Sequence, residues 1–514
     1  MPILNWLNKD EAITTSKKCT YRLLEEVPEL SYGDADNENL LIQGDNLEAL
    51  KALIPYYAGK VKCIFIDPPY NTKSAFDHYD DNLEHSKWLS LIYPRLELLR
   101  ELLSEQGSIF VTIDDNESHY LKVVMDELFG RCNFVTSFIW RKVDSPNDNK
   151  VTITPDHEYV FCYAKNIEKA VFERKSDSSI LDSYRSPDDS SEKPYRDRLL
   201  KKNGKASLRE DRPSMYFPIS DPDGNLIYPV HDDGRDARWA LGKKAVDELI
   251  SQDKLVWKKR GDSWIPYTRE FAPDNPTRPW PTIWNDLHTT RQTKAHLTAL
   301  LGSSLSFDTP KPEDLVARII TMTTKPGELV LDSFAGTGTT GSTAHKLGRK
   351  WILVEIGNHS QSHIKPRLQK VIEGKDTGGI TMDSNWESGG GFRFYKLGEA
   401  VFDEYGCLNT GIKFPTLASH IWYLETKTPL GNKADTPLLG VHNDTAYYLL
   451  YNGILGDRRP VGGNVLTSKV LNNLPDMNKH ERIVIYGESS RLGEARLKQA
   501  NITFKQIPYD VGTL

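Results

Sequence analysis

The stretch Val61-Lys-Cys-Ile-Phe-Ile-Asp-Pro-Pro-Tyr-Asn-Thr72 joins a short apolar run to an abrupt polar end. The run Ile64 to Ile66 predicts a buried strand. Pro68 and Pro69 cannot continue a central strand, because proline donates no N–H and fixes φ. Asp67 and Tyr70 are therefore expected at the carboxyl end of a buried strand, where open α/β sheets bind ligands.

The polar end of this stretch has the chemistry to hold an exocyclic amine on a flat base. The Asp67 carboxylate and the Pro68 carbonyl can both accept hydrogen bonds from an amino group, and Pro69 helps to stiffen the turn. Tyr70 offers a π-face to a base that has left its stack. A strand end capped by a stiff turn with a half-buried tyrosine explains the same residues, so the choice depends on the rest of the chain.

Composition limits the class of protein. The chain has 514 residues, with 38% hydrophobic and 10% aromatic residues, which favours a globular protein of about three domains. The net charge of -6 means that any nucleic-acid site must be a local basic groove. Five scattered cysteines argue against zinc or a disulfide framework and suit a reducing cytoplasm. We therefore expect no metal. We also expect no membrane span, since no stretch is apolar enough to cross a bilayer.

Strand and helix patterns alternate through the first part of the chain and again after about Pro310. This alternation predicts an α/β fold with a doubly wound, mostly parallel sheet. Strands are expected at 40–46, 64–66, 108–114, 134–140, 157–163, 328–332 and 351–355, and helices at 47–54, 86–103, 117–129, 312–322 and after Gly341.

The pattern breaks in a polar segment at 166–280. Basic residues from Lys193 to Arg212 and the run Trp257-Lys-Lys-Arg260 are interleaved with aromatics, which suits phosphate contacts and base stacking. A solvated surface insertion is the alternative interpretation. Glycines at 389–391 suggest a hinge before an α/β tail. The expected organisation is 1–38 as an N-terminal extension, 39–165 as a catalytic half, 166–280 as an insertion, 281–390 as a cofactor half and 391–514 as a C-terminal region that contacts a second copy or a partner.

A second motif runs from Asp332 through Phe334, Gly336 and Gly338 to Gly341, which predicts a strand, a glycine turn and a helix start. Glycines let a backbone approach a ligand closely. Glu355 ends the next strand, about 20 residues beyond the turn, where ribose hydroxyls are bound in related sites. The motif therefore predicts an adenosine cofactor, with a purely structural glycine turn as the alternative.

Three cofactors fit such a turn. A phosphate-binding loop would need a lysine where Ser342 stands, which argues against ATP. The spacing also matches a dinucleotide turn, but nothing indicates hydride transfer, and Asp67 to Tyr70 would have no role in it. S-adenosylmethionine fits both motifs, because it carries adenosine without phosphate and delivers a methyl group.

Together these motifs resemble the amino-group DNA methyltransferases, and their order resembles the β class that methylates adenine N6. The segments 43–50, 67–72, 282–286 and 332–340 resemble the modification (Mod) subunits of Type III restriction–modification systems, over about residues 38–400. The resemblance implies double-stranded DNA as substrate, base flipping, a homodimer, and 166–280 as the target-recognition region.

The resemblance also implies roles for single residues. Asp67 and Pro68, supported by Pro69, would hold the target amine while Tyr70 stacks on the adenine. The expected cofactor residues are Asp332, Phe334, Gly336 and Gly338 at the turn, Glu355 at the ribose, Asp45 at the adenine ring, and Thr309, Lys311, Thr339 and Thr340 at the methionine carboxylate. Asp45 alone would equally suit a helix N-cap.

The expected reaction is in-line transfer from sulfonium to amine nitrogen, without a covalent intermediate and without a metal. Asp rather than Ser at position 67 favours adenine N6 over cytosine N4. A chain that mainly recognises DNA and needs a partner to methylate is the alternative. Cleavage would require a separate restriction subunit, since no helicase signature is present and the weak Glu425-Thr-Lys427 pattern does not indicate a nuclease.

Overall fold

The computed structural model describes residues 3–71, 75–76, 79–80, 84–144, 152–184, 193–303, 309–403, 408–431 and 434–511. Thr72, the last residue of the first motif, lies outside this part of the chain. The chain forms two compact units, which are described separately: Met1–Glu173 with Pro281–Leu514, and Arg174–Trp280.

The first unit is built on a sheet of 11 strands in the order β1-β20-β3-β19-β18-β4-β7-β9-β8-β17, with β2 paired to β20. The strands from β20 to β7 in this order are all parallel, whereas β9 is antiparallel to both of its neighbours. The predicted doubly wound, mostly parallel sheet is confirmed. The strands are β1 (Arg22–Glu26), β2 (Tyr32–Gly33), β3 (Leu40–Gln43), β4 (Val61–Ile66), β7 (Leu103–Ile113), β8 (Phe134–Arg141), β9 (His157–Ala164), β17 (Ile283–Trp284), β18 (Leu329–Asp332), β19 (Lys350–Glu355) and β20 (Gly391–Ala400).

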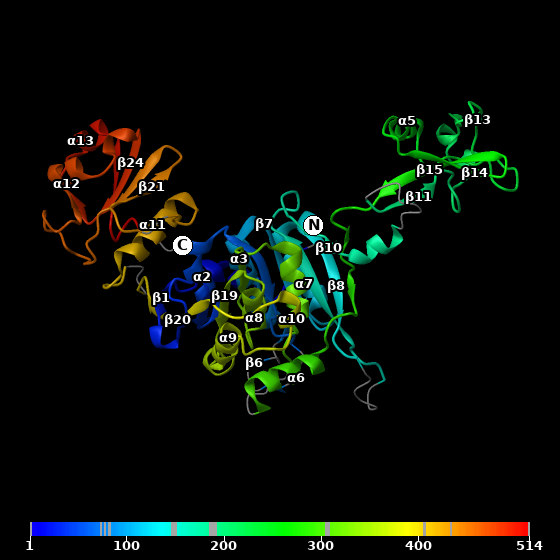
Figure 1. The fold of residues 1–514 in the computed structure, drawn as a ribbon. Coiled ribbons are helices and arrows are strands. Elements are labelled where there is room, and N and C mark those ends of the chain that lie inside the picture. The colour runs from blue at the N-terminus through cyan, green and yellow to red at the C-terminus, as the bar shows by residue number, and fades with distance from the viewer. Residues whose placement is uncertain are drawn as a thin grey trace. The chain divides into compact units, whose positions relative to one another are not determined.

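Helices cover the sheet in two groups. Helices α1, α2 and α3 pack together, and α7 and α9 both pack on α8, in front of the sheet in Figure 1. Because both faces are covered, β4 is buried over its whole length, which explains its apolar sequence. The helices of this unit that precede the C-terminal region are α1 (Lys9–Lys18), α2 (Asn46–Tyr57), α3 (His85–Leu102), α4 (Ser118–Met125), α6 (Thr290–Leu301), α7 (Glu313–Thr323), α8 (Thr339–Lys346), α9 (Lys365–Ile372) and α10 (Thr381–Ser384).

The parallel strands place several acids at one edge of the sheet. Asp67 directly follows β4, Asp332 ends β18 and Glu355 ends β19, while Asp45 follows β3. Neighbouring parallel strands bring their carboxyl ends to the same edge. The two sequence motifs, far apart in the chain, therefore meet where β4 pairs with β18.

The glycines at 389–391 are not a hinge, contrary to our expectation. They lead into β20, which lies between β1 and β3 in the central sheet. A Cβ on Gly391 would lie 2.5 Å from the Asp34 backbone nitrogen, so glycine is needed for close strand approach rather than for flexibility. The N-terminal segment also joins this sheet, because β1 and β2 both pair with β20.

The rest of the first unit carries a smaller sheet of order β21-β22-β24-β26, in which the last three strands are parallel. No helix in the described residues is long and apolar enough to cross a membrane. The elements here are α11 (Phe414–Thr426), β21 (Leu438–His442), β22 (Thr445–Leu449), β23 (Val465–Leu466), α12 (Ser468–Asn473), β24 (Arg482–Gly487), β25 (Ser489–Ser490), α13 (Glu494–Gln499) and β26 (Ile502–Gln506), while β5 (Ala75–Phe76) and β6 (Tyr79–Asp80) pair with each other near the first motif.

The second unit, 174–280, has its own core of Leu200, Ile219, Trp239 and Val246. The irregular polar sequence therefore folds as a small β-rich body. Its elements are β10 (Lys175–Ser176) paired with β16 (Thr277–Arg278), the antiparallel sheet β11 (Tyr195–Leu199), β15 (Ser263–Phe271) and β14 (Leu255–Arg260), the pair β12 (Ile219–Ser220) and β13 (Leu226–Ile227), and α5 (Lys243–Ser251).

Candidate active site

Asp67 is held from three directions at the end of β4. Its Oδ1 accepts hydrogen bonds from the Tyr70 hydroxyl at 2.8 Å and the Thr112 hydroxyl at 2.5 Å. Its Oδ2 accepts a hydrogen bond from Lys311 Nζ at 2.7 Å. The side chain nevertheless keeps 25% exposure. Asp67 is thus a fixed acceptor that remains accessible from one side.

A second carboxylate, Glu158 on β9, shares these partners. Its Oε2 lies 2.9 Å from the Tyr70 hydroxyl and 3.5 Å from Lys311 Nζ, and its Oε1 lies 3.3 Å from Lys142 Nζ. The sequence interpretation missed Glu158. A glutamate inside an otherwise apolar and aromatic strand is a usable signal, because a buried charge needs partners.

The pKa shifts within this cluster have clear directions and causes. Burial disfavours the ammonium of Lys311, but the Asp67 and Glu158 carboxylates outweigh it and raise the pKa of Lys311. Burial, strengthened by the same two carboxylates, raises the pKa of Tyr70 well above its usual value. Lys311 is therefore a cation and Tyr70 a neutral hydrogen-bond donor.

The turn after β4 is fixed from outside. The Pro69 carbonyl accepts a hydrogen bond of 2.7 Å from Trp88 Nε1 on α3. Asn71 has a φ of 59° and donates from Nδ2 to Glu117 Oε1 at 2.7 Å, which also lies 2.7 Å from His85 Nδ1. Pro68 is buried. The acceptors at 67–68 therefore sit on a rigid support.

The glycine turn is braced by the two acids at the ends of its flanking strands. Asp332 accepts hydrogen bonds from the Phe334 backbone nitrogen at 2.9 Å and the Thr340 hydroxyl at 2.5 Å. Glu355 Oε2 accepts a hydrogen bond of 2.7 Å from the Gly336 nitrogen. Burial, with smaller contributions from Asp67 and Glu355, raises the pKa of Asp332 to about 7.

Two glycines of this turn have backbone angles that favour glycine. Gly336 has a φ of 53° and Gly338 a φ of 75°. A Cβ on Gly338 would lie 2.8 Å from Ile364 Cγ2. The turn therefore stays free of side chains where α8 begins, as close approach by a ligand requires.

Other predicted cofactor residues make separate contacts. Asp45 is the N-cap of α2, with Oδ1 accepting from Leu47 N at 2.9 Å, and its Oδ2 lies 3.1 Å from Arg95 Nη2. The alternative interpretation of Asp45 as an N-cap therefore holds in the structure. Thr309 is exposed, whereas Lys311 reaches Asp67. Of the four residues expected at the methionine carboxylate, Lys311 thus lies at the first motif, whereas Thr339 and Thr340 lie at the glycine turn.

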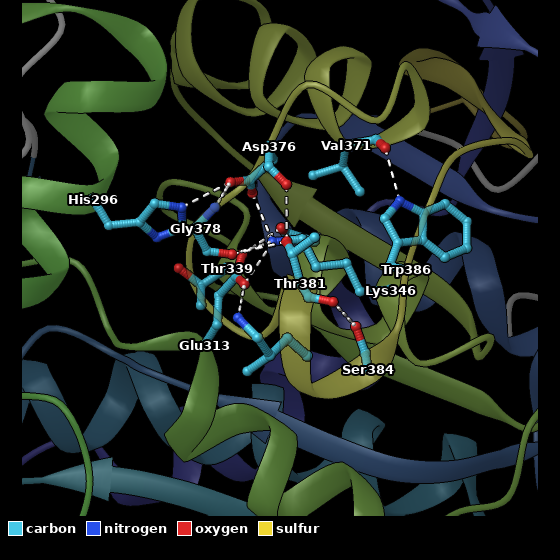
Figure 2. Close-up of polar contacts among 12 residues, drawn as sticks. His296, Glu313, Thr339, Lys346, Val371, Asp376, Gly378, Thr381, Ser384 and Trp386 are labelled. Atoms are coloured by element: carbon cyan, nitrogen blue, oxygen red, sulfur yellow. Dashed lines mark hydrogen bonds and ion pairs between the residues drawn. The ribbon is translucent and has the colours of Figure 1, made fainter.

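A buried charge network lies beside the glycine turn (Figure 2). Lys346 Nζ lies 2.7 Å from both Glu313 Oε2 and Asp376 Oδ2. His296 Nε2 lies 2.9 Å from Asp376 Oδ1. Arg367 connects this network to the turn, since its Nη2 donates to Glu313 at 2.9 Å and its Nη1 to the Thr339 hydroxyl at 2.9 Å.

This network gives α7, α8 and α9 a common polar core. The four charged side chains other than His296 are at most 1% exposed. Buried ion pairs of this kind fix geometry more than they add stability. In the described residues, no group of three or more His, Cys, Asp or Glu side chains is placed to hold a metal ion.

This sheet, with an acid–Pro-Pro-Tyr turn beside a glycine turn, defines a protein of the α/β methyltransferase class. The family model described as DNA methylase matches residues 61–366, and the chain belongs to this family. S-adenosylmethionine is the methyl donor that the family uses.

The chain is also similar in sequence to individual proteins of known class. The chain is 31% identical to the Mod subunit of the Type III enzyme EcoPI of Escherichia phage P1, over 68% of this chain and 61% of that protein. It is 32% identical to the Type II methyltransferase M.KpnI of Klebsiella pneumoniae, over 68% and 88%. It is 29% identical to the EcoP15I Mod subunit of Escherichia coli, over 68% and 62%. The matched part therefore spans less than two thirds of these Mod subunits, and the predicted resemblance to them is confirmed.

Proposed function

We propose that this protein methylates the N6 amine of adenine in a specific sequence of double-stranded DNA, with S-adenosylmethionine as methyl donor, as the modification enzyme of a restriction–modification system. One observation carries the proposal. Asp67, fixed by Tyr70, Thr112 and Lys311, keeps an accessible carboxylate at the strand end next to the glycine turn.

The residues of the glycine turn fit an adenosine ligand of this kind. The turn has no side chains at Gly336 and Gly338, and Gly338 has no room for one. Glu355, at the end of the next strand, is a carboxylate in the place where ribose hydroxyls are bound. Phe334 and Asp332 would complete this wall, with Asp45 after β3 and its partner Arg95 on α3. When bound, S-adenosylmethionine supplies an electrophilic methyl group.

The chain's own groups would prepare the amine. An adenine amino nitrogen is a weak nucleophile, because its lone pair is delocalised into the ring. Hydrogen bonds from its N–H groups to Asp67 and to the Pro68 carbonyl favour a pyramidal nitrogen and stabilise the positive charge that develops there. As the new N–C bond forms, the S–C bond breaks and leaves a neutral thioether. The methylated nitrogen then releases one proton to water, directly or through Asp67, so no strong base is required beforehand. The Tyr70 ring, oriented through its hydroxyl, stacks on the extruded base.

The unit 174–280 is proposed to read the DNA. Much of its positive charge is paired internally: Asp197 lies within 3.0 Å of both Lys258 and Arg269, and Glu270 within 3.2 Å of both Arg196 and Arg198. Lys259 and Arg260, at the end of the β14–β15 hairpin, are exposed, and Lys259 Nζ lies 5.4 Å from the Trp264 ring centre. We therefore assign phosphate contacts to this hairpin rather than to every basic residue of the unit.

The relatives support a proposal for the partners of this protein. EcoPI and EcoP15I are named as Type III restriction–modification enzymes with Mod subunits, which supports a separate restriction subunit as partner here. A homodimer and a cytoplasmic location complete this proposal. Cytosine N4 is the competing target, and Asp rather than Ser at position 67 favours adenine.

The test is nucleoside mass spectrometry of duplex DNA after incubation with the purified protein and S-adenosylmethionine. We expect N6-methyladenine. N4-methylcytosine would contradict the proposed base. Methylation that begins only when a restriction subunit is added would favour a chain that mainly recognises DNA.

A further inference from the structure

Glu158 stands out because it contacts two residues of the proposed catalytic cluster without belonging to either sequence motif. It lies on β9, where the neighbouring residue Tyr159 is paired with Ile113 of β7. The side chain of Glu158 is 7% exposed, as is that of Lys311. Burying a carboxylate to this degree is unfavourable unless its partners compensate for the lost hydration.

The hydrogen bonds of Tyr70 show how the two carboxylates are linked. The hydroxyl oxygen lies 2.8 Å from Asp67 Oδ1 and 2.9 Å from Glu158 Oε2, yet it carries one proton. Asp67 has two further donors, Thr112 and Lys311. Glu158 thus competes with Asp67 for the same hydroxyl and fixes the tyrosine between them.

A second role of Glu158 follows from the charges around Asp67. Asp67 and Lys311 alone would form a neutral pair at 2.7 Å, and a neutral pair is poorly suited to stabilise a cation. Glu158, 3.5 Å from the same ammonium, adds a second negative charge. Lys142 Nζ lies 3.3 Å from the other oxygen of Glu158, with a side chain that is 21% exposed, and offsets part of this charge from that oxygen.

We propose that Glu158 is a positioning residue of this active site, which holds Lys311 and Tyr70 and gives the three contacting groups Asp67, Lys311 and Glu158 a net negative charge. This inference rests on the proposed methyl transfer, in which the target nitrogen becomes positively charged. Glu158 itself does not contact the base. It keeps Lys311 from neutralising Asp67 at the moment when that charge develops.

The test compares single-turnover methylation rates of the wild type, Glu158→Gln and the double variant Glu158→Gln with Lys311→Met. Glutamine keeps the shape and an acceptor for Tyr70 but removes the charge. We expect Glu158→Gln to lower the rate by about 10²-fold, the scale of one electrostatic contact in an active site. The double variant removes one charge of each sign, so we expect its rate to exceed that of Glu158→Gln by roughly tenfold.

Two controls separate this role from a loss of fold. Glu105→Gln removes a surface charge whose side chain is 56% exposed, and we expect the wild-type rate. Binding of S-adenosylmethionine, measured by calorimetry, should be equal in the wild type and Glu158→Gln. A Glu158→Gln rate equal to the wild type, or a double variant slower than Glu158→Gln, would overturn the inference alone. A wild type that forms no methylated base would overturn the proposed function and this inference with it.

Discussion

Lys311 Nζ lies 2.7 Å from Asp67 Oδ2, although the two residues are 244 positions apart. The contact joins the chain that follows α6 to the end of β4. It also places a cation against the carboxylate that we assign to the target amine. This ion pair therefore connects the segment before the insertion at 166–280 to the segment after it.

Replacing Lys311 by methionine tests this ion pair. Asp67 and Glu158 would then share Tyr70 without the ammonium between them, and leaving buried charges unpaired costs about 3 kcal/mol or more. We expect a lower free energy of unfolding by urea, because Asp67 and Glu158 lose the ammonium that pairs with both of them. Lys325→Met is the control, since that side chain is 73% exposed. Equal unfolding midpoints for the two variants would contradict the account.

Gly338→Ala tests the glycine turn. The φ of 75° disfavours alanine, and the added Cβ would lie 2.8 Å from Ile364 Cγ2. We expect lower stability and weaker binding of S-adenosylmethionine by calorimetry. Gly348→Ala is a matched control: its φ is 69°, but the nearest atom to its Cβ is Pro326 Cβ at 3.9 Å. The control should lose about 1–2 kcal/mol of stability from φ alone and keep cofactor affinity. Equal losses of affinity would refute a steric role.

The raised pKa of Asp332 predicts a specific pH dependence of the free energy of unfolding. Burial, with Asp67 and Glu355, raises the pKa of Asp332 to about 7 from 3.8. The folded state thus holds this proton more tightly than the unfolded state, so the stability contributed by Asp332 falls as pH rises from about 4 to 7. Between pH 5 and 7 the loss is about 2 kcal/mol.

Asp332→Asn should remove this contribution. Urea unfolding of wild type and variant at pH 5 and pH 7 measures it, and we expect the wild type to lose more stability over this interval than the variant. Asparagine can still accept the hydrogen bond from the Phe334 nitrogen, so the turn keeps that support. Parallel pH profiles would show that Asp332 does not hold its proton in the folded state.

The Glu313–Arg367 ion pair predicts that replacing both residues lowers the free energy of unfolding less than replacing Arg367 alone. Arg367→Met alone removes a guanidinium 2.9 Å from a buried carboxylate and should cost about 3–5 kcal/mol. Adding Glu313→Leu removes the orphaned charge, while Lys346 keeps Asp376 at 2.7 Å. We expect the double variant to unfold at higher urea than Arg367→Met. Additive losses would mean that the two charges do not act as a pair.

The sequence predicted the central sheet because its strands are buried on both faces and therefore read as apolar runs, as Ile64 to Ile66 do. It predicted the two turns because proline restricts the backbone locally, whereas glycine permits backbone angles that other residues rarely adopt. It did not predict β20, because the glycines before it resemble a linker and the close approach to Gly33 depends on pairing far along the chain. Glu158 was missed for the same reason: its partners Tyr70 and Lys311 are distant in sequence, and only the folded sheet brings them together.

The most direct test of the central claim compares N6-methyladenine formed by the wild type, Asp67→Ala and the control Asp115→Ala, by nucleoside mass spectrometry of duplex DNA. Asp115 follows β7 near the same edge of the sheet, but it is outside the cluster around Asp67. We predict N6-methyladenine from the wild type and the control, and at least a 10²-fold loss, about the scale of one electrostatic contact, for Asp67→Ala. Undiminished N6-methyladenine from Asp67→Ala would contradict the account.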